Sequence, residues 1–214
     1  MALTLYAHPL SSYCQKVLIA LYEHGVPFEW KLLSSETPEN SAKFAELWPL
    51  RYMPVLTDGQ RVLRESSIII EYLDLIAAGG TRLIPEDAEA ALEVRFYDRV
   101  FDNFIMARQQ AIVSDHLRPE GVHDSFGVAQ ARQRLDVAYG WLERVLPDGW
   151  IVGNAFTMAD CAAAPALFYA DKTHPLKGRF PRVAAYLERL EARASNARVR
   201  REARPYWHLF PFAD

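Results

Sequence analysis

The sequence has 214 residues, half of them hydrophobic and about a quarter charged, with a formal net charge of −3. Such a chain is long enough for one large domain or two small ones, and its composition is that of a soluble globular protein. The charge gives nucleic acid no electrostatic attraction, and no apolar segment approaches the length that crosses a bilayer. We therefore expect no nucleic-acid partner and no membrane partner.

The cysteine and histidine content limits the compartment and the chemistry. Cys14 and Cys161 are the only cysteines, and their separation gives no disulfide framework, which is typical of a reducing compartment. No N-terminal stretch has the composition of a secretion signal. The six histidines show no spacing typical of metal ligands. We predict a cytoplasmic protein without a metal, whose one basic run, ARASNARVRREAR, is a solvated helix face.

The first elements of the chain are predicted to form a βαβ unit. Residues 3–7 (LTLYA) have the apolar composition of a buried strand, and residues 12–24 carry apolar side chains at helical spacing. Gly25 follows where a helix commonly ends. Residues 28–33 (FEWKLL) are predicted as a second strand, parallel to the first.

The remainder of the first 80 residues completes a thioredoxin-type half. A short helix is predicted near residues 40–47, and Asp58-Gly59 lies between two short apolar runs, which is a strong hairpin signal. The segment SSIIIEYLDLIAA is predicted as a helix that stops at Gly79-Gly80. The order β-α-β-α-β-β-α predicts an α/β thioredoxin-like domain over residues 1–80.

The second half, after a linker over residues 81–86, is predicted to be an all-α domain over residues 87–214. We find no strand pattern there and expect a short tail helix after longer helices over 87–117, 124–146, 157–170 and 181–196. Thr157 and Asp160 form a variant capping box, with Phe156 and Cys161 at the positions of a hydrophobic staple. This segment is therefore interpreted as structural.

Met53-Pro54 is a candidate for ligand binding. The proline precedes the predicted hairpin, on a strand expected next to the Ser11 end of the sheet, and this placement suggests a cis peptide bond. A cis bond turns the preceding N–H and C=O outward, so Met53 is suited to pair with an extended peptide ligand. An ordinary trans proline at a strand edge is the alternative.

Glu65 and Ser66 stand at the start of a predicted helix. The serine is expected to cap this helix, because the first N–H groups of a helix need an acceptor. A second interpretation is that Ser66 and the first amides bind a ligand carboxylate, while Glu65 binds a ligand ammonium. These two ligand groups side by side are the end of an α-amino acid.

The segment SSYCQKVLIAL, residues 11–21, resembles the start of a thioredoxin-like helix in which Ser11 replaces the first redox cysteine. Ser11 or Ser12 caps the helix, or the Ser11 hydroxyl donates a hydrogen bond to a thiolate that belongs to the ligand. A hydroxyl and a helix N-terminus supply the order of the roughly 2.7 kcal/mol that lowering a thiol pKa by about two units requires. Cys14 is either a small buried hydrophobe or a redox-active thiol.

Taken together, these motifs resemble the cytosolic glutathione transferase family over essentially the whole chain. The resemblance is carried by PLSSYCQKVLIAL, WPLRYMPVLTDG, ESSIIIEYL and GNAFTMADCAAAPALF, in this order and at this spacing. It implies a thioredoxin-like domain that binds glutathione and an all-helical domain that completes a pocket for a small hydrophobic electrophile. It also implies a homodimer, with glutathione as co-substrate.

The family's functional residues are carried over by position. Ser11 falls where the serine-type classes, such as theta, delta and zeta, keep their catalytic hydroxyl. The resemblance implies that glutathione is bound by Met53, ahead of Pro54, by Glu65 and Ser66 at its γ-glutamyl end, and by Arg51 towards its glycyl carboxylate. The zeta signature runs Ser-Ser-Cys, whereas Tyr13 here separates Ser12 from Cys14. This departure weakens a maleylacetoacetate isomerase assignment and leaves the class open.

The second-substrate pocket is expected along the helix that begins near residue 87. Besides Ser12, its lining is predicted to be the stripe Tyr97, Phe101, Phe104 and Arg108, which has helical spacing. A core or dimer contact is the alternative for this stripe. The aromatic tail RPYWHLFPF is either a core plug or a flap over the site.

Three functional hypotheses follow. The first is a glutathione transferase in which Ser11 stabilises a thiolate that attacks an electrophilic carbon or a hydroperoxide. The second is a glutathione-binding or ligand-carrying protein with little conjugating activity. The third is a thiol-disulfide reductase that uses Cys14.

Overall fold

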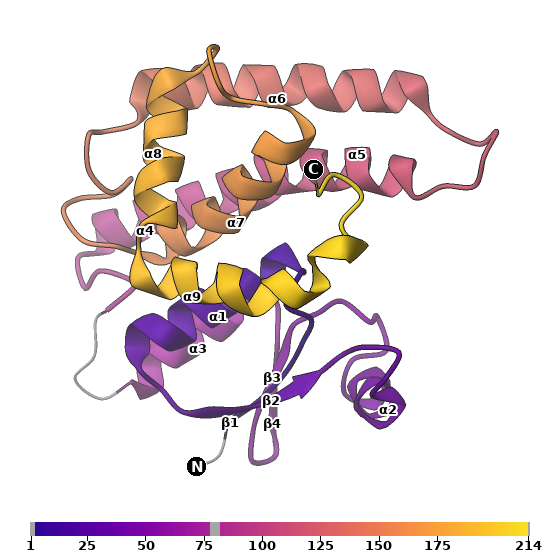
Figure 1. Ribbon diagram of the computed structural model, residues 1–214. Coiled ribbons are helices and arrows are strands. Elements are labelled where there is room, and N and C mark those ends of the chain that lie inside the picture. The colour runs from indigo at the N-terminus through magenta and orange to yellow at the C-terminus, as the bar shows by residue number, and fades with distance from the viewer. Residues whose placement is uncertain (1–2, 78–81, 214) are drawn as a thin grey trace.

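The computed structural model describes residues 3–77 and 82–213 and places a small sheet with its helices next to a larger group of helices (Figure 1). The predicted order of the first half is confirmed. Its elements are β1 (Leu3–Ala7), α1 (Ser12–His24), β2 (Phe28–Leu32), α2 (Pro38–Leu47), β3 (Val55–Asp58), β4 (Arg61–Arg64) and α3 (Ser66–Ile76). The predicted helix stop at Gly79-Gly80 and the first residue of the predicted linker lie outside the described residues.

The sheet has the strand order β2-β1-β3-β4. β1 pairs in parallel with β2, with Leu3 opposite Phe28, and in antiparallel with β3, with Leu3 opposite Asp58. β3 and β4 form the predicted hairpin, whose turn places Gly59 at a positive φ of 56° that glycine adopts without steric cost. This mixed sheet, with α1 as the crossover between its parallel strands, is the thioredoxin-like arrangement that the sequence predicts.

The second half is helical throughout the part of it that the structure describes. Its elements are α4 (Ala88–Val100), a π-helical segment (Phe101–Met106), α5 (Ala107–His116), α6 (Ser125–Val145), α7 (Met158–Thr173), α8 (Pro181–Glu191), α9 (Ala194–Ala203) and a 3₁₀ turn (Arg204–Leu209). The single helix predicted over residues 87–117 is thus interrupted by a π-helical segment, and the one predicted over 181–196 is divided into α8 and the start of α9. Among the described residues, no helix has the length and apolarity needed to span a membrane.

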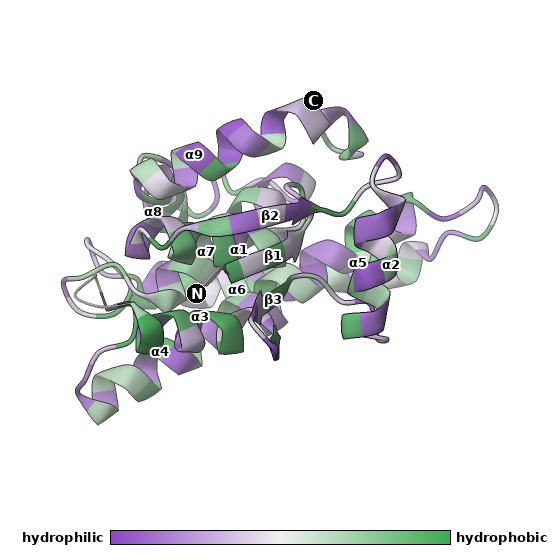
Figure 2. Cartoon of the chain, turned by 90° about the horizontal axis from the view of Figure 1, so that it is seen from below, coloured by the Kyte–Doolittle hydropathy of each residue, from purple (hydrophilic) through white to green (hydrophobic). Residues whose placement is uncertain are grey.

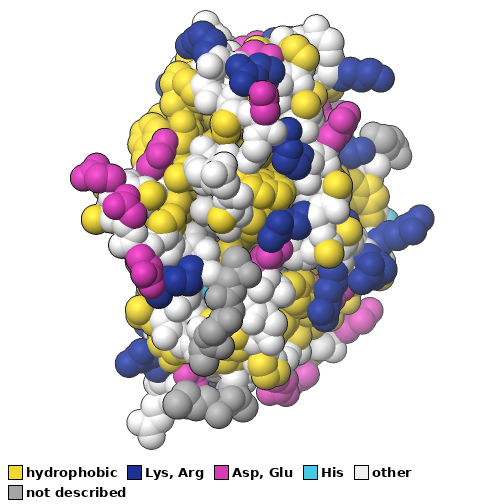
Figure 3. All heavy atoms as spheres, turned by 90° about the vertical axis from the view of Figure 1, so that its left-hand side faces the viewer, with side chains coloured by type: hydrophobic (Ala, Val, Ile, Leu, Met, Phe, Trp, Pro, Cys, Tyr) yellow, Lys and Arg dark blue, Asp and Glu magenta, His cyan; other side chains and the backbone are white. Residues whose placement is uncertain are grey.

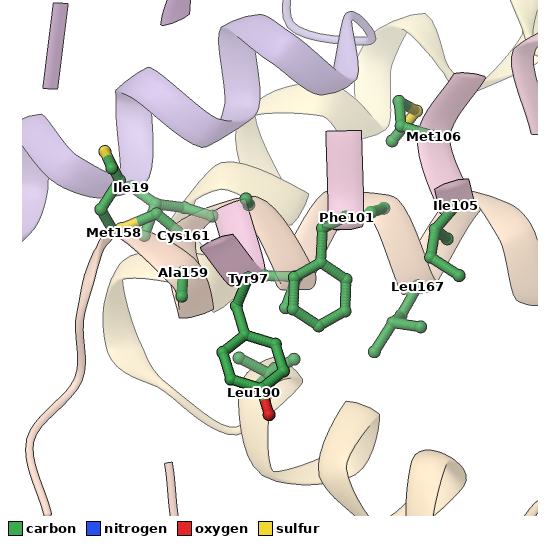
Figure 4. Packing of buried hydrophobic residues seen from close by; sticks show 14 of the residues in the cluster. Ile19, Tyr97, Phe101, Ile105, Met106, Met158, Ala159, Cys161, Leu167 and Leu190 are labelled. Atoms are coloured by element: carbon green, nitrogen blue, oxygen red, sulfur yellow. The ribbon is translucent and has the colours of Figure 1, made fainter. Parts of the chain in front are cut away.

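One hydrophobic core joins the two halves. α7 packs against both α1 and α4, and Figure 4 shows side chains from α1, α4 and α7 in the same cluster. Ile19 of α1 and Met158, Ala159 and Cys161 of α7 are almost completely buried in it. Figure 2 shows hydrophobic residues concentrated in α1, α3 and α7, whereas α9 is largely hydrophilic. The packing of α7 against α1 and α4 therefore fixes the two halves against each other.

Polar contacts fix the halves at two further places. The Asp74 carboxylate at the end of α3 accepts hydrogen bonds from the N–H groups of Leu83 and Ile84, at 2.8 and 3.0 Å. Near the C-terminal end of α1, the Arg193 guanidinium donates two hydrogen bonds to the Glu23 carboxylate, at 2.7 and 2.6 Å. These bonds hold the start of the helical half against α3 and the segment before α9 against α1.

The basic run was predicted to be a solvated helix face, and this prediction is wrong for two of its arginines. The side chain of Arg193 is 27% exposed and that of Arg200 is 15% exposed. Arg200 pairs with Glu191 at 2.9 Å and stacks on Phe168, with 3.6 Å between the guanidinium carbon and the ring centre. The run therefore binds α9 to the rest of the protein.

The predicted capping box at the start of α7 is present. The fully buried Asp160 carboxylate accepts from the Thr157 N–H at 2.8 Å, from the Ile151 N–H at 3.2 Å and from the Tyr186 hydroxyl at 2.6 Å. Burial raises the pKa of this carboxyl, although these hydrogen bonds oppose the rise. One side chain thus satisfies polar groups from three segments of the helical half.

We predict that Asp160→Ala lowers the free energy of unfolding by about 2–4 kcal/mol, because it leaves several buried donors without an acceptor. Urea denaturation followed by circular dichroism measures this change. Asp124 caps the exposed start of α6 through the Gly127 N–H at 2.8 Å, and Asp124→Ala is the matched control with an expected loss of about 1 kcal/mol. Equal losses for the two variants would contradict the role given to Asp160.

Candidate functional site

The start of α1 is capped by Ser11. The Ser11 hydroxyl accepts from the Cys14 N–H at 3.4 Å, and the Ser11 N–H donates to the His8 carbonyl at 3.0 Å. Ser12, the first helical residue, is buried. Of the two serines that the sequence left open as the cap, Ser11 is the cap.

Cys14 lies beneath this cap and is completely buried. Burial raises the pKa of its thiol to about 12, although hydrogen bonds with Ser11 and His8 oppose the rise. A thiol must be ionised and accessible to exchange with a disulfide. The environment of Cys14 therefore favours the buried hydrophobe over the redox-active thiol.

The peptide bond between Met53 and Pro54 is cis, as predicted. It precedes β3, and among the described loops no backbone hydrogen bond is formed by Met53. The backbone of Met53 is therefore available to an extended ligand. Two non-glycine residues near this loop, Arg51 and Glu65, adopt positive φ values of 57° and 65°. Such conformations are uncommon for these residue types and cluster at functional sites.

The start of α3 differs from the prediction. Ser66 was expected to cap this helix, but it is the first helical residue, and the cap position is occupied by Glu65 without a side-chain hydrogen bond. The predicted serine cap is therefore wrong. Because Glu65 makes no side-chain cap, the first N–H groups of α3 have no side-chain acceptor from the cap residue. The positive end of the helix dipole is therefore open to an anion.

A cavity of about 300 Å³ brings four of the predicted glutathione-binding residues together. Its wall contains Met53, Pro54, Glu65 and Ser66, together with residues that the sequence analysis did not select, which are Tyr13, Tyr52, Arg99, Asp102 and Asn103. The missed residues come from α1, from the loop before β3 and from α4 and the π-helical segment. Arg51 lies outside this wall, in a neighbouring cavity that also contains Met53.

A group of polar and charged side chains adjoins this cavity, and we call it the Lys16 cluster, made of Lys16, Ser67, Asp98, Arg99 and Asp102. Lys16, Asp98 and Asp102 are buried, whereas the Arg99 side chain is about half exposed. Lys16 Nζ lies 2.5 Å from Asp98 Oδ1 and 2.8 Å from Asp102 Oδ2, and the Lys16 side chain is only 1% exposed. Ser67 accepts from Lys16 at 2.9 Å and donates to Asp98 at 2.7 Å. Arg99 lies 2.6 Å from both carboxylates. The cluster joins α1, α3, α4 and the π-helical segment.

The two carboxylates of the Lys16 cluster are in different electrostatic situations. Burial opposes the ionisation of Asp98, but Lys16 and Arg99 outweigh it and lower the pKa of this carboxyl. Burial raises the pKa of Asp102, and the neighbouring Asp98 adds to the rise. Asp102, which lines the cavity, is therefore less strongly held in its charged form than Asp98, although Lys16 and Arg99 lie beside it as well.

A second cavity of about 210 Å³ lies beside the first. Its wall includes Ser11, Ser12 and Tyr13 from the start of α1, and Leu10, Gln109, Gln110, Val113, Leu117, Tyr169, Leu209, Phe210 and Pro211 complete it. The sequence left the aromatic tail as a core plug or a flap. The structure shows elements of both, because Phe210 is buried in the core and also lines this cavity.

The predicted stripe on the helix after residue 87 does not line the second cavity. Tyr97 and Phe101 are buried in the common core, where Figure 4 shows them. Phe104 and Arg108 line a separate apolar groove of about 520 Å³ between α4, the π-helical segment and α6. The pattern is amphipathic as predicted, but the π-helical segment begins at Phe101, so ideal α-helical spacing does not describe which side chains share a face.

One face of the surface is of mixed character. Figure 3 shows one face of the molecule, on which hydrophobic side chains lie among basic and acidic ones. Among the described residues, no group of three or more histidine, cysteine or acidic side chains is arranged to hold a metal ion.

Comparisons with known proteins agree with this architecture. Residues 5–81 match the model of the glutathione S-transferase N-terminal domain, and residues 125–189 match that of the glutathione S-transferase C-terminal domain. The chain is 31% identical to glutathione S-transferase 3 of Zea mays over 202 residues, which are 89% of this chain and 90% of that protein. It is 29% identical to a probable maleylacetoacetate isomerase of Vibrio cholerae, over 96% of this chain and 98% of that protein.

Solved structures give the same result. The crystal structure of a glutathione S-transferase from Methylobacillus flagellatus with glutathione bound has a TM-score of 0.84 and 26% identity to this chain. The similarity covers 92% of this chain and 98% of the other. Fold and site therefore define a two-domain enzyme with a thioredoxin-like half and a helical half. The chain belongs to the glutathione S-transferase family.

We predict that Lys16→Met lowers the free energy of unfolding by about 3–5 kcal/mol, because it leaves the buried Asp98 and Asp102 with one cation fewer. Equilibrium urea unfolding measures the loss. Lys31 is a matched control, since it also pairs with a carboxylate, Glu29, at 2.6 Å, but on the surface. Lys31→Met should leave the unfolding midpoint nearly unchanged. A stable Lys16→Met protein would show that the cluster does not hold the halves together.

Proposed function

We propose that this chain binds glutathione in the 300 Å³ cavity and transfers it to a small hydrophobic electrophile bound in the 210 Å³ cavity. The observation that carries the proposal is the meeting of Met53, Glu65 and Ser66 at one cavity wall, beside a helix N-terminus without a side-chain cap. The relatives support it by their names, and one related structure contains bound glutathione.

The proposed position of glutathione follows from the chemistry of each wall. The α-carboxylate of its γ-glutamyl end is matched to Ser66 and the first N–H groups of α3. The α-ammonium is matched to the carboxylates of Glu65 and Asp102, of which Asp102 is buried beside Asp98 and gains from a further cation. Met53 pairs with the cysteinyl backbone in the manner of an added strand. The glycyl carboxylate then extends towards Arg51, in the cavity that shares Met53.

The proposed reaction uses the thiolate as nucleophile. The thiol proton passes to solvent, and the Ser11 hydroxyl donates a hydrogen bond to the sulfur at the start of α1. The sulfur lone pair forms a bond to the electrophilic carbon, while the bond from that carbon to its leaving group breaks and the leaving group departs with the electron pair. A free thiol near pKa 8.5 is only a few per cent ionised at neutral pH, so stabilising the thiolate raises the rate.

We predict that Ser11→Ala raises the pKa seen in the pH profile of kcat/KM and lowers kcat/KM by about 10–100-fold at neutral pH, because one charge-assisted hydrogen bond is lost. Steady-state conjugation of glutathione to an activated aryl chloride across a pH series measures both. Ser12→Ala is the comparison, since Ser12 borders the same cavity. Unchanged kinetics for Ser11→Ala would remove Ser11 from the mechanism, and a loss confined to Ser12→Ala would assign the role to Ser12.

A cytoplasmic location is also part of the proposal. Both cysteines are free thiols, and both are buried. Burial raises the pKa of each, which keeps them in the thiol form. Such cysteines suit a reducing compartment, where disulfides do not persist.

We also propose that two copies of the chain associate through the apolar groove on α4, the π-helical segment and α6. Its wall contains Phe96, Phe104 and Val137, which are 51%, 54% and 70% exposed. Leu92, one helical turn before Phe96 on α4, is 63% exposed. Large exposed apolar patches on one face are typical of protein interfaces. Because the family resemblance implies a homodimer, we propose a second copy of the chain as the partner that covers this groove.

Phe104→Asp is predicted to shift the protein from dimer to monomer, because it would remove the exposed aromatic ring and bury a carboxylate in an apolar interface. Sedimentation velocity at micromolar concentration measures the change. Val122, which is 55% exposed in the loop between α5 and α6, provides the control, and Val122→Asp should remain dimeric. A monomeric wild-type protein, or a dimeric Phe104→Asp protein, would overturn this assignment.

A further inference from the structure

Tyr13 occupies a distinctive place between the two cavities. Of the described residues that line the 300 Å³ and the 210 Å³ cavities, Tyr13 is the one that both walls share. It is the second residue of α1, two positions after Ser11, and it is only partly buried. Ser11 and Ser12, by contrast, line the second cavity and not the first.

The Tyr13 hydroxyl is available for a ligand. Among the described residues, this hydroxyl has no hydrogen-bond partner, and only burial and nearby charges shift its pKa. Other tyrosine hydroxyls at the contact between the halves have partners: Tyr169 donates to the Leu10 carbonyl at 2.8 Å, and Tyr22 donates to Glu202 at 2.6 Å. Unlike these two, the Tyr13 hydroxyl at the junction of the cavities is free to bond a ligand.

The Tyr13 phenol stays protonated over the pH range in which a thiol ionises. Burial, and next the charge of Asp102, raise the pKa of Tyr13 to about 12. The charged groups that face this side chain in the first cavity are Glu65, Arg99 and Asp102, while the second cavity has no charged lining residue among those described. The hydroxyl is thus a hydrogen-bond donor at neutral pH and does not compete with the thiol for its charge.

The path of the reaction places the sulfur at the same junction. On the proposed function, on which this inference rests, the cysteinyl part of glutathione lies at Met53 in the first cavity and the electrophile lies in the second. The sulfur must therefore face both cavities in order to attack. We propose that the Tyr13 hydroxyl donates a hydrogen bond to the thiolate of bound glutathione, as a second catalytic donor beside Ser11.

The test compares Tyr13→Phe with the wild type. The substitution keeps the ring that separates the cavities and removes only the hydroxyl. The pKa of enzyme-bound glutathione, measured by the ultraviolet absorbance of the thiolate, should rise by about one unit, and conjugation below that pKa should slow about tenfold. Binding of S-methylglutathione, which has no thiolate, should be unchanged. Tyr72, whose hydroxyl bonds to Asp58 at 2.6 Å, gives the matched control, and Tyr72→Phe should retain the wild-type thiol pKa.

The outcomes separate this inference from the function on which it rests. If the wild type binds glutathione without lowering its thiol pKa and conjugates no electrophile, the proposed function fails. If the wild type lowers the thiol pKa and Tyr13→Phe lowers it equally, the proposed function stands and the role of Tyr13 is overturned. Equal weakening of glutathione and S-methylglutathione binding, with the thiol pKa unchanged, assigns Tyr13 to packing and also overturns it.

Discussion

The contact between Lys16 and the carboxylates of Asp98 and Asp102 is the constraint on which the arrangement of the two halves depends. An ammonium that is almost fully buried needs its counter-charges at a fixed place, because either charge alone would be strongly unfavourable in the core. The pairing therefore fixes α1 of the thioredoxin-like half against α4 and the π-helical segment of the other half. Ser67 adds the start of α3 to the same group.

This constraint also determines which groups the 300 Å³ cavity, the proposed glutathione site, presents to a ligand. Asp102 and Arg99 belong to the Lys16 cluster and at the same time form part of the cavity wall, next to Glu65 and Ser66. The cavity thus contains an open helix N-terminus for an anion and two carboxylates for a cation. In the proposed function, the groups that bind the zwitterionic end of glutathione are placed by the same contacts that hold the halves together, so stability and recognition share side chains.

Local sequence patterns were sufficient for much of the fold and for part of the site. The glycine after α1, the hairpin at Asp58-Gly59, the cis peptide bond before Pro54 and the capping box of α7 depend on a few neighbouring residues, and each is present. The missed features depend on distant contacts. Tyr13 and Asp102 reach one cavity only after the halves pack, and the burial of Tyr97 and Phe101 depends on α7. The sequence feature that could have indicated this part of the site is the spacing of Asp98 and Asp102, which lie about one helical turn apart and directly follow Tyr97 and Phe101.

The tail after α9 has a consequence for how the protein can change over evolutionary time. Leu209, Phe210 and Pro211 form one side of the second cavity, while the first cavity is lined by residues from other segments. Leu209 is also exposed, so its replacement requires no repacking of the common core. In the proposed function, substitutions at Leu209 alter which electrophiles fit while thiolate formation is left intact. The choice of substrate can therefore diverge among descendants of this protein faster than the use of glutathione.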